Sequence, residues 1–138
     1  KLTTSSYTVT YASGRKNVGT YKVTIKMKGN YTGTKTLTFK INPPKTSVSS
    51  LTAGSKKFTV KWKKQATQTT GYQIQYSTSS KFTKSKTVTV SKNSTTSKTI
   101  SKLSGKKKYY VRVRTYKTVG KAKYYSAWSK AKTVITKK

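Results

Sequence analysis

The chain has 138 residues, with 32 Lys and Arg and no Asp, Glu, His or Cys, so its formal charge is +32. This composition lacks the side chains on which general acid–base catalysis, protein metal sites and disulfides mainly depend. We therefore expect no enzyme activity, no catalytic residue, no cofactor and no metal. No apolar stretch approaches the ~18 residues of a membrane span, so we also expect no transmembrane segment.

High charge and low hydrophobicity usually indicate disorder, but the arrangement of the apolar residues argues against it here. The chain contains 11 Tyr, 2 Trp and 3 Phe, and most of them lie in runs where apolar and polar residues alternate. Alternation of this kind is typical of strands with one buried face. No segment repeats its apolar residues at helical spacing. The sequence predicts an all-β protein.

Residues 1–42 contain three alternating runs, at 7–11, 21–27 and 37–41. Turn-forming residues separate them, first Gly14 and Asn17 and then Gly29, Asn30 and Gly33. We expect a three-stranded antiparallel meander with an apolar face on one side. That face comprises Tyr7, Val9, Tyr11, Tyr21, Val23, Ile25, Met27, Leu37, Phe39 and Ile41.

A single three-stranded layer needs a cover, because about forty residues bury too little surface to fold alone. We expect the apolar face of residues 7–41 to pack against a second copy, giving a homo-oligomer, or against the surface of a neighbouring domain. A strict monomer in light scattering at high concentration would remove the first version.

The runs YTVTY, NVGTY and GNYTGT, followed by Phe39-Lys40-Ile41, resemble the C-terminal half of the bacterial immunoglobulin-like repeats of secreted Firmicutes proteins. The resemblance covers residues 7–41, and the first half of the repeat is missing. It implies that residues 1–42 are a partial Ig-like domain.

Asn42-Pro43-Pro44 breaks strand pairing and stiffens the chain, so we place a domain boundary there. Residues 43–138 then show about seven strand-like runs at intervals of 10 to 15 residues, which is the spacing of a β-sandwich. We expect the last of them to run from about Trp128 to Ile135.

Residues 43–138 resemble a fibronectin type III domain. The likeness rests on Trp62, on the strand GYQIQY from Gly71 to Tyr76, on Leu103 followed six residues later by Tyr109, and on YYSAWS around Trp128. It implies a seven-stranded sandwich in which Trp62 is a core residue. It also implies that Leu103 and Tyr109 form a tyrosine corner, in which the phenol bonds back to the chain.

Tyr110, Arg112, Arg114 and Tyr116 alternate with inward residues, so they should share one outer face. Such a face could stack on nucleic-acid bases or sugars and bind polyanions. Alternatively, the arginines form a cation–π ladder with Trp128 of the last strand, as in related receptor domains. We favour the ladder, because cation–π pairs are common in folded chains.

The charge alone predicts weak, salt-sensitive binding to polyanions such as DNA, RNA and anionic wall polymers. Two function classes follow. The first is a non-catalytic spacer or adhesion module of a secreted or cell-wall-attached bacterial protein, located outside the cell. The alternative is a cationic polyanion-binding protein, including an engineered variant without acidic residues. Lysines are spread over all strands rather than gathered on one face, which favours the first class or the engineered form.

Overall fold

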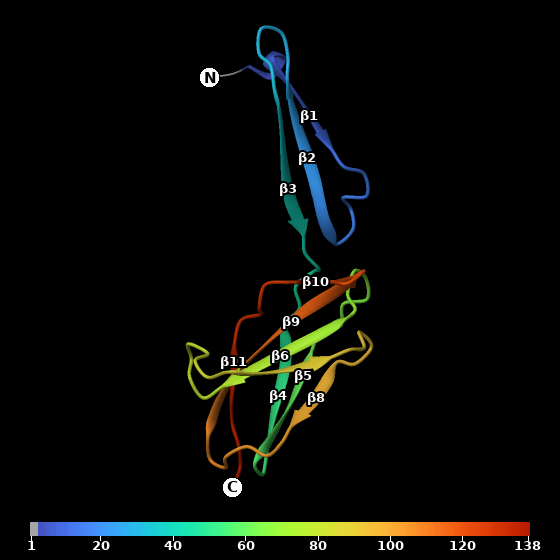
Figure 1. Ribbon diagram of the computed structural model, residues 1–138. Helices are drawn as coiled ribbons and strands as arrows, with labels where there is room; N and C mark the ends of the chain where they lie inside the picture. Colours follow the sequence, from blue (N-terminus) through green and yellow to red (C-terminus); the bar gives the residue numbers. More distant parts are fainter. Residues whose placement is uncertain (1–2) are drawn as a thin grey trace. The chain divides into compact units, whose positions relative to one another are not determined.

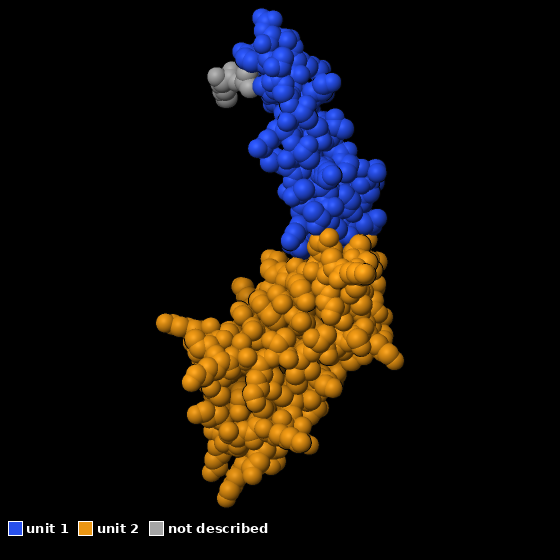
Figure 2. All heavy atoms as spheres, viewed as in Figure 1, with its two compact units in different colours: residues 1–42 blue, residues 43–138 orange. Residues whose placement is uncertain are grey.

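The computed structural model describes residues 3–138, and its regular secondary structure consists of antiparallel strands and one 3-10 turn, which confirms the predicted all-β class. The chain divides into two compact units, unit 1 (Lys1–Asn42) and unit 2 (Pro43–Lys138), distinguished by colour in Figure 2. The described residues include no helix with the length and apolarity that a membrane crossing needs.

Unit 1 is a three-stranded meander in the order β1-β2-β3, preceded by a single 3-10 turn (Figure 1). The elements are η1 (Thr4–Ser6), β1 (Tyr7–Tyr11), β2 (Gly19–Met27) and β3 (Thr34–Ile41). The Tyr21 hydroxyl ties the first turn, lying 2.8 Å from the Gly14 carbonyl oxygen and 3.0 Å from that of Asn17. Gly14 has a φ of +75°, which a residue without Cβ adopts at low cost.

The strand register brings the apolar residues of unit 1 onto one face. Val9 lies opposite Ile25, Tyr11 lies opposite Val23, and Tyr21 lies opposite Phe39. Much of this face is open, and Tyr11 is 51% exposed. A shallow apolar depression of about 480 Å³ lies over β1 and β2, lined by Tyr7, Val9, Tyr11, Val23, Ile25 and Met27. That a second copy or a neighbouring domain covers this face stays a prediction.

Unit 2 is a sandwich of two antiparallel sheets (Figure 1). One sheet has the order β4-β5-β8, from β4 (Val48–Gly54), β5 (Lys57–Trp62) and β8 (Ser97–Ile100). The other has the order β10-β9-β6-β7, with β11 also paired to β9. Its strands are β6 (Gly71–Ser77), β7 (Lys86–Val90), β9 (Lys108–Val119), β10 (Ala122–Tyr125) and β11 (Lys132–Ile135).

The last predicted strand is interrupted, so the seven expected runs become eight strands. β10 and β11 pair with successive parts of β9, and residues 126–131 between them have no strand conformation. The prediction of a strand beginning near Trp128 was wrong in this respect. The physical reason is that serine side chains, described below, take over part of the pairing with β9.

The core of unit 2 lies between the two sheets and comes from the inward residue of each alternating pair. Six of these side chains are fully buried, namely Phe58, Val60, Tyr72, Ile74, Val111 and Val113. Three aromatic side chains are nearly fully buried, namely Trp62, Tyr76 and Tyr109. Aromatic rings meet here at angles, as Phe58 and Tyr76 do with centroids 5.9 Å apart and planes at 80°. The Tyr72 hydroxyl accepts from Gln65 N (2.9 Å) and donates to the Asn93 carbonyl (3.0 Å), which makes its burial tolerable.

The chain enters and leaves unit 2 at opposite ends of β4. At one end, Lys63 N donates to the Ser47 carbonyl, next to the Val48–Trp62 pair. At the other end, Lys137 N donates to the Gly54 carbonyl at 2.9 Å. Seven residues of strand lie between these points, a distance of roughly 20 Å at the usual rise per residue.

Candidate functional site

The candidate residues lie on β9, whose alternation decides which side chains reach the outer face of the sheet. Tyr109, Val111, Val113 and Thr115 point inward and are buried. Tyr110, Arg112, Arg114 and Tyr116 occupy the alternate positions, as expected for a strand. The structure brings the two arginines of this set together with three aromatic rings from other segments.

These side chains form a ladder of alternating rings and guanidinium groups. Arg112 Cζ lies 3.9 Å from the centroid of the Phe82 ring and 4.9 Å from that of Trp128. Arg114 Cζ lies 4.3 Å from the Trp128 centroid and 4.1 Å from that of Tyr125. The order of members is therefore Phe82, Arg112, Trp128, Arg114 and Tyr125. We call this set the arginine–aromatic ladder.

Two glutamines of β6 complete the ladder by accepting hydrogen bonds from the arginines. Gln75 lies opposite Arg112, and Gln73 lies opposite Arg114, in the strand register. Arg112 Nε donates to Gln75 Oε1 at 2.7 Å. Arg114 donates from Nε (3.0 Å) and Nη2 (2.8 Å) to Gln73 Oε1. In many proteins a carboxylate would fill this role; here neutral amide oxygens do, so each guanidinium keeps its full charge uncompensated.

Burial lowers the pKa of both arginines from its usual high value. For Arg114, nearby Tyr125 opposes that effect on the pKa and the positive charge of Arg112 adds to it. Both groups remain cations at neutral pH, since an arginine pKa starts so high. The rings therefore hold two like charges side by side through cation–π attraction.

The outer face of β9 is not an open stacking surface, which corrects one part of the sequence interpretation. Strand alternation predicts that Tyr116 shares this face with the arginines and is available for stacking, but Tyr116 is only 4% exposed. Its ring packs against Tyr125, with centroids 6.2 Å apart, and lies over Gly71. Tyr110 is half-buried, with Lys108 Nζ 5.5 Å from its ring centroid. Rings of the same chain already lie over both guanidiniums.

Two serines beside Trp128 hold the ladder against β9. Ser126 N donates to the Thr115 carbonyl (3.1 Å), and Ser126 Oγ accepts from Thr115 N (3.1 Å). Ser129 repeats this arrangement two residues along β9, with Val113 carbonyl (2.8 Å) and Val113 N (3.0 Å). Each serine thus supplies both a donor and an acceptor to one β9 residue, and the Trp128 ring is held over the arginines.

The residues expected to be structural occupy the following places. Trp62 is 3% exposed and belongs to the core. Tyr109 accepts a hydrogen bond from Ser104 N at 3.2 Å, and Leu103 packs partly buried against the core. Trp128 lies in the ladder and is half-buried. The hydrogen bond from Ser104 N to the Tyr109 hydroxyl, together with the packing of Leu103, is the geometry that a tyrosine corner requires.

Sequence reasoning missed Phe82 and Tyr125 as ladder members, and it missed Gln73 and Gln75 as the hydrogen-bond acceptors of the two arginines. The alternation of Gln73 and Gln75 around Ile74 carried a usable signal, because it puts both amides on the outer face of the strand. Phe82 lies in an irregular connection, where no periodicity indicates its partner.

The stability of unit 2 is expected to be almost independent of pH from about 7 to about 3, because no side-chain carboxylate or histidine exists to take up protons. In alkali the tyrosines matter. Burial, together with Tyr109 for Tyr76 and Tyr125 for Tyr116, raises the pKa of each phenol above its usual 10.0. The contribution of these two phenols to the free energy of unfolding is complete below pH ~10. It is lost as the pH rises further, because the unfolded chain releases these protons at a lower pH than the folded one.

Chemical denaturation of the protein and of a Tyr76→Phe, Tyr116→Phe double variant, repeated from about pH 3 to 11, tests both parts. Lysine titration affects both proteins alike and cancels in the comparison. The free energy of unfolding of the parent should fall relative to the variant only above pH ~10. A cooperative acid transition near pH 4 would contradict the first expectation.

Known proteins resemble this chain in sequence and in structure. The family model described as the fibronectin type III domain matches residues 42–132. Among solved structures, the crystal structure of the chicken CNTN1 FN1-FN3 domains is similar, with a TM-score of 0.62 and 21% sequence identity. The similarity covers 88% of this chain and 44% of the chicken chain, so this chain spans less than half of the length of the chicken chain. No curated protein matches the chain.

Proposed function

Because the chain belongs to the fibronectin type III family, whose domains are typically non-catalytic and commonly extracellular, we propose that it serves as a spacer and adhesion module of a secreted or cell-wall-attached bacterial protein. The observation that carries this proposal is the path of the chain through unit 2. Entry and exit lie at opposite ends of β4, so the sandwich adds its length to any chain that continues through it.

The contacts on the outer face of the sheet favour a structural role. The arginine–aromatic ladder is saturated by its own rings and by Gln73 and Gln75. Side chains that satisfy one another stiffen the sheet, which suits a domain that holds others apart. The bacterial context is supported by the resemblance of residues 7–41 to half of a bacterial immunoglobulin-like repeat.

The lysines also support a spacer over a dedicated polyanion-binding protein. They occur on strands of both sheets, for example Lys61 of β5, Lys98 of β8 and Lys117 of β9. A protein that tracks a polymer along a groove concentrates its charge on one side. Here the charge covers the surface, which favours solubility and non-specific attraction.

An electrophoretic-mobility titration with duplex DNA, single-stranded DNA and heparin tests this proposal. All three polymers should bind alike at low salt and lose affinity by ~10³-fold or more between about 50 and 200 mM salt. One polymer that stays bound with saturable stoichiometry at physiological salt would instead support a cationic polyanion-binding protein.

A further inference from the structure

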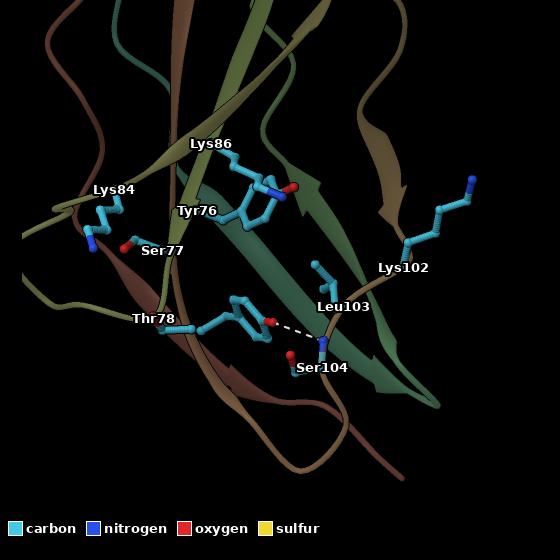
Figure 3. A pocket seen from close by; sticks show the side chains of 9 residues that line it. Tyr76, Ser77, Thr78, Lys84, Lys86, Lys102, Leu103 and Ser104 are labelled. Atoms are coloured by element: carbon cyan, nitrogen blue, oxygen red, sulfur yellow. Dashed lines mark hydrogen bonds between the residues drawn. The ribbon is translucent and has the colours of Figure 1, made fainter.

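One end of unit 2 holds a pocket of about 240 Å³ that no part of the proposed function uses. It lies where the end of β6, the start of β7 and the connection from β8 to β9 meet (Figure 3). Tyr76 and Tyr109 form its inner wall, and Lys84, Lys86 and Lys102 lie around them. At ~30 Å³ for a water molecule in the liquid, the space is large enough for a small polyatomic ligand.

The two phenols in this pocket have hydroxyl protons that no described residue accepts. Tyr76 is 8% exposed and Tyr109 is 7% exposed. The Tyr109 oxygen accepts a hydrogen bond from Ser104 N at 3.2 Å, and among the described residues no acceptor is seen for the Tyr109 proton. The Tyr76 oxygen is not among the fully buried unpaired atoms of the described residues, so this hydroxyl is open to the pocket and can reach a ligand there. Burial raises the pKa of Tyr76, which keeps its phenol protonated and able to donate at neutral pH.

Lysines supply the charge at the rim of the pocket. Figure 3 shows Lys86 close to Tyr76, while the side chains of Lys84 and Lys102 extend outward on either side. The sequence offers no Asp or Glu to neutralise them. Lysine side chains are long and flexible, so their ammonium groups can fold over an anion bound between them. The ammonium groups only donate hydrogen bonds, and the phenols can donate as well, so the pocket fits a ligand that accepts.

A second pocket of unit 2, with a volume of about 410 Å³, shows that lysines alone do not create this arrangement. It is lined by Lys45, Lys130, Lys132 and Ser129 among others, and two of these side chains are engaged within the chain. Lys132 Nζ donates to the Ser49 carbonyl at 3.0 Å. Ser129 Oγ lies 3.0 Å from Val113 N and 3.0 Å from the Lys130 carbonyl. The pocket beside Tyr76 differs because two phenol hydroxyls lie among its lysines.

We propose that the pocket beside Tyr76 binds a tetrahedral oxyanion, a sulfate or phosphate group. The Tyr76 and Tyr109 hydroxyls donate to its oxygens from the inner wall, and Lys84, Lys86 and Lys102 neutralise its charge from the rim. The group can be a free inorganic ion or an ester carried by a polymer. This inference does not depend on the spacer function, and either can fail without the other.

The test is a two-dimensional amide NMR titration with sodium sulfate and with sodium phosphate, at ionic strength held constant with sodium chloride. Saturable shifts are expected at residues 76–78, 84–86 and 102–104. Tyr76→Phe keeps the ring and removes the donor, so it should weaken binding about tenfold. Tyr110→Phe removes a phenol outside the pocket and should leave the affinity unchanged. Loss of folding is visible in the same spectra.

Charge is controlled separately by two triple variants that each lose three lysines. Lys84, Lys86 and Lys102 changed together to Gln should abolish the saturable response. Lys22, Lys26 and Lys40, in unit 1, changed to Gln should preserve it. Heparin and polyphosphate, titrated into the same proteins, distinguish a polymer-borne group from a free ion. A weaker response to the polymers than to the inorganic ions identifies the free ion as the ligand.

Shifts that rise linearly without saturation, or that are spread over lysines of both units, would show charge screening only and overturn the proposal. The proposal is also overturned if Tyr76→Phe and Tyr110→Phe bind sulfate with equal affinity. Equal losses in the two triple variants would overturn it as well, since general charge would then explain the binding.

Discussion

Replacing Trp128 with alanine is expected to lower the free energy of unfolding of unit 2 by about 3 kcal/mol. The ring lies between two guanidiniums, 4.9 Å from Arg112 Cζ and 4.3 Å from Arg114 Cζ. Its removal takes away packing and leaves the two like charges without the ring that separates them. The chain has no side-chain carboxylate that could compensate. Thermal unfolding followed by circular dichroism should show a drop of roughly 15 °C.

Two further variants separate the ladder from general loss of an aromatic side chain. Trp128→Phe keeps a smaller ring and should lose about half as much. Tyr110→Ala removes a half-buried ring outside the ladder and should cost under ~1 kcal/mol. If Trp128→Ala costs no more than Tyr110→Ala, the ladder contributes little to stability.

Gly71→Ala is expected to destabilise unit 2 by about 3 kcal/mol, near the upper end for overpacking. A Cβ at this position would lie 2.1 Å from the Val90 carbonyl oxygen and 3.0 Å from ring and hydroxyl atoms of Tyr116. The carbonyl belongs to β7 and cannot move without disturbing the pairing of β6 with β7. The Tyr116 ring is buried and has no free space to enter.

Urea denaturation measures this loss, and hydrogen exchange should locate it at the end where Tyr72 pairs with Val90. Gly54→Ala provides a matched control on β4, a strand of the other sheet. Its Cβ would meet only the side chain of Lys57, at 2.9 Å, and that side chain can rotate away. The control should lose under ~1 kcal/mol. A Gly71→Ala variant as stable as this control would show that β7 yields easily.

The alternation of apolar residues was sufficient to predict most strands, because burial of one face imposes that period on the sequence. Tyr72, Ile74 and Tyr76 illustrate it, with Gln73 and Gln75 between them on the outer face. The interruption after Tyr125 could not be found in this way. There the pairing with β9 passes through the hydroxyls of Ser126 and Ser129, and a hydroxyl leaves no trace in apolar periodicity.

The candidate site was predicted only in part, because its members come from distant segments. The positions of Arg112 and Arg114 follow from strand alternation, but their partners depend on the register between β6 and β9. The burial of Tyr116 depends on the missing side chain of Gly71 and on the position of Tyr125. Such contacts follow from the tertiary arrangement and not from local sequence.

The hydrogen bonds from Arg112 to Gln75 and from Arg114 to Gln73 also make this domain a useful host for measuring a single ion pair. Exchanging either glutamine for glutamate introduces the only side-chain carboxylate of the chain, directly opposite a guanidinium that is already in place. Its titration would be free of signals from other acidic side chains. The coupling between one carboxylate and one arginine can then be determined in a folded protein without correcting for a network of other acids.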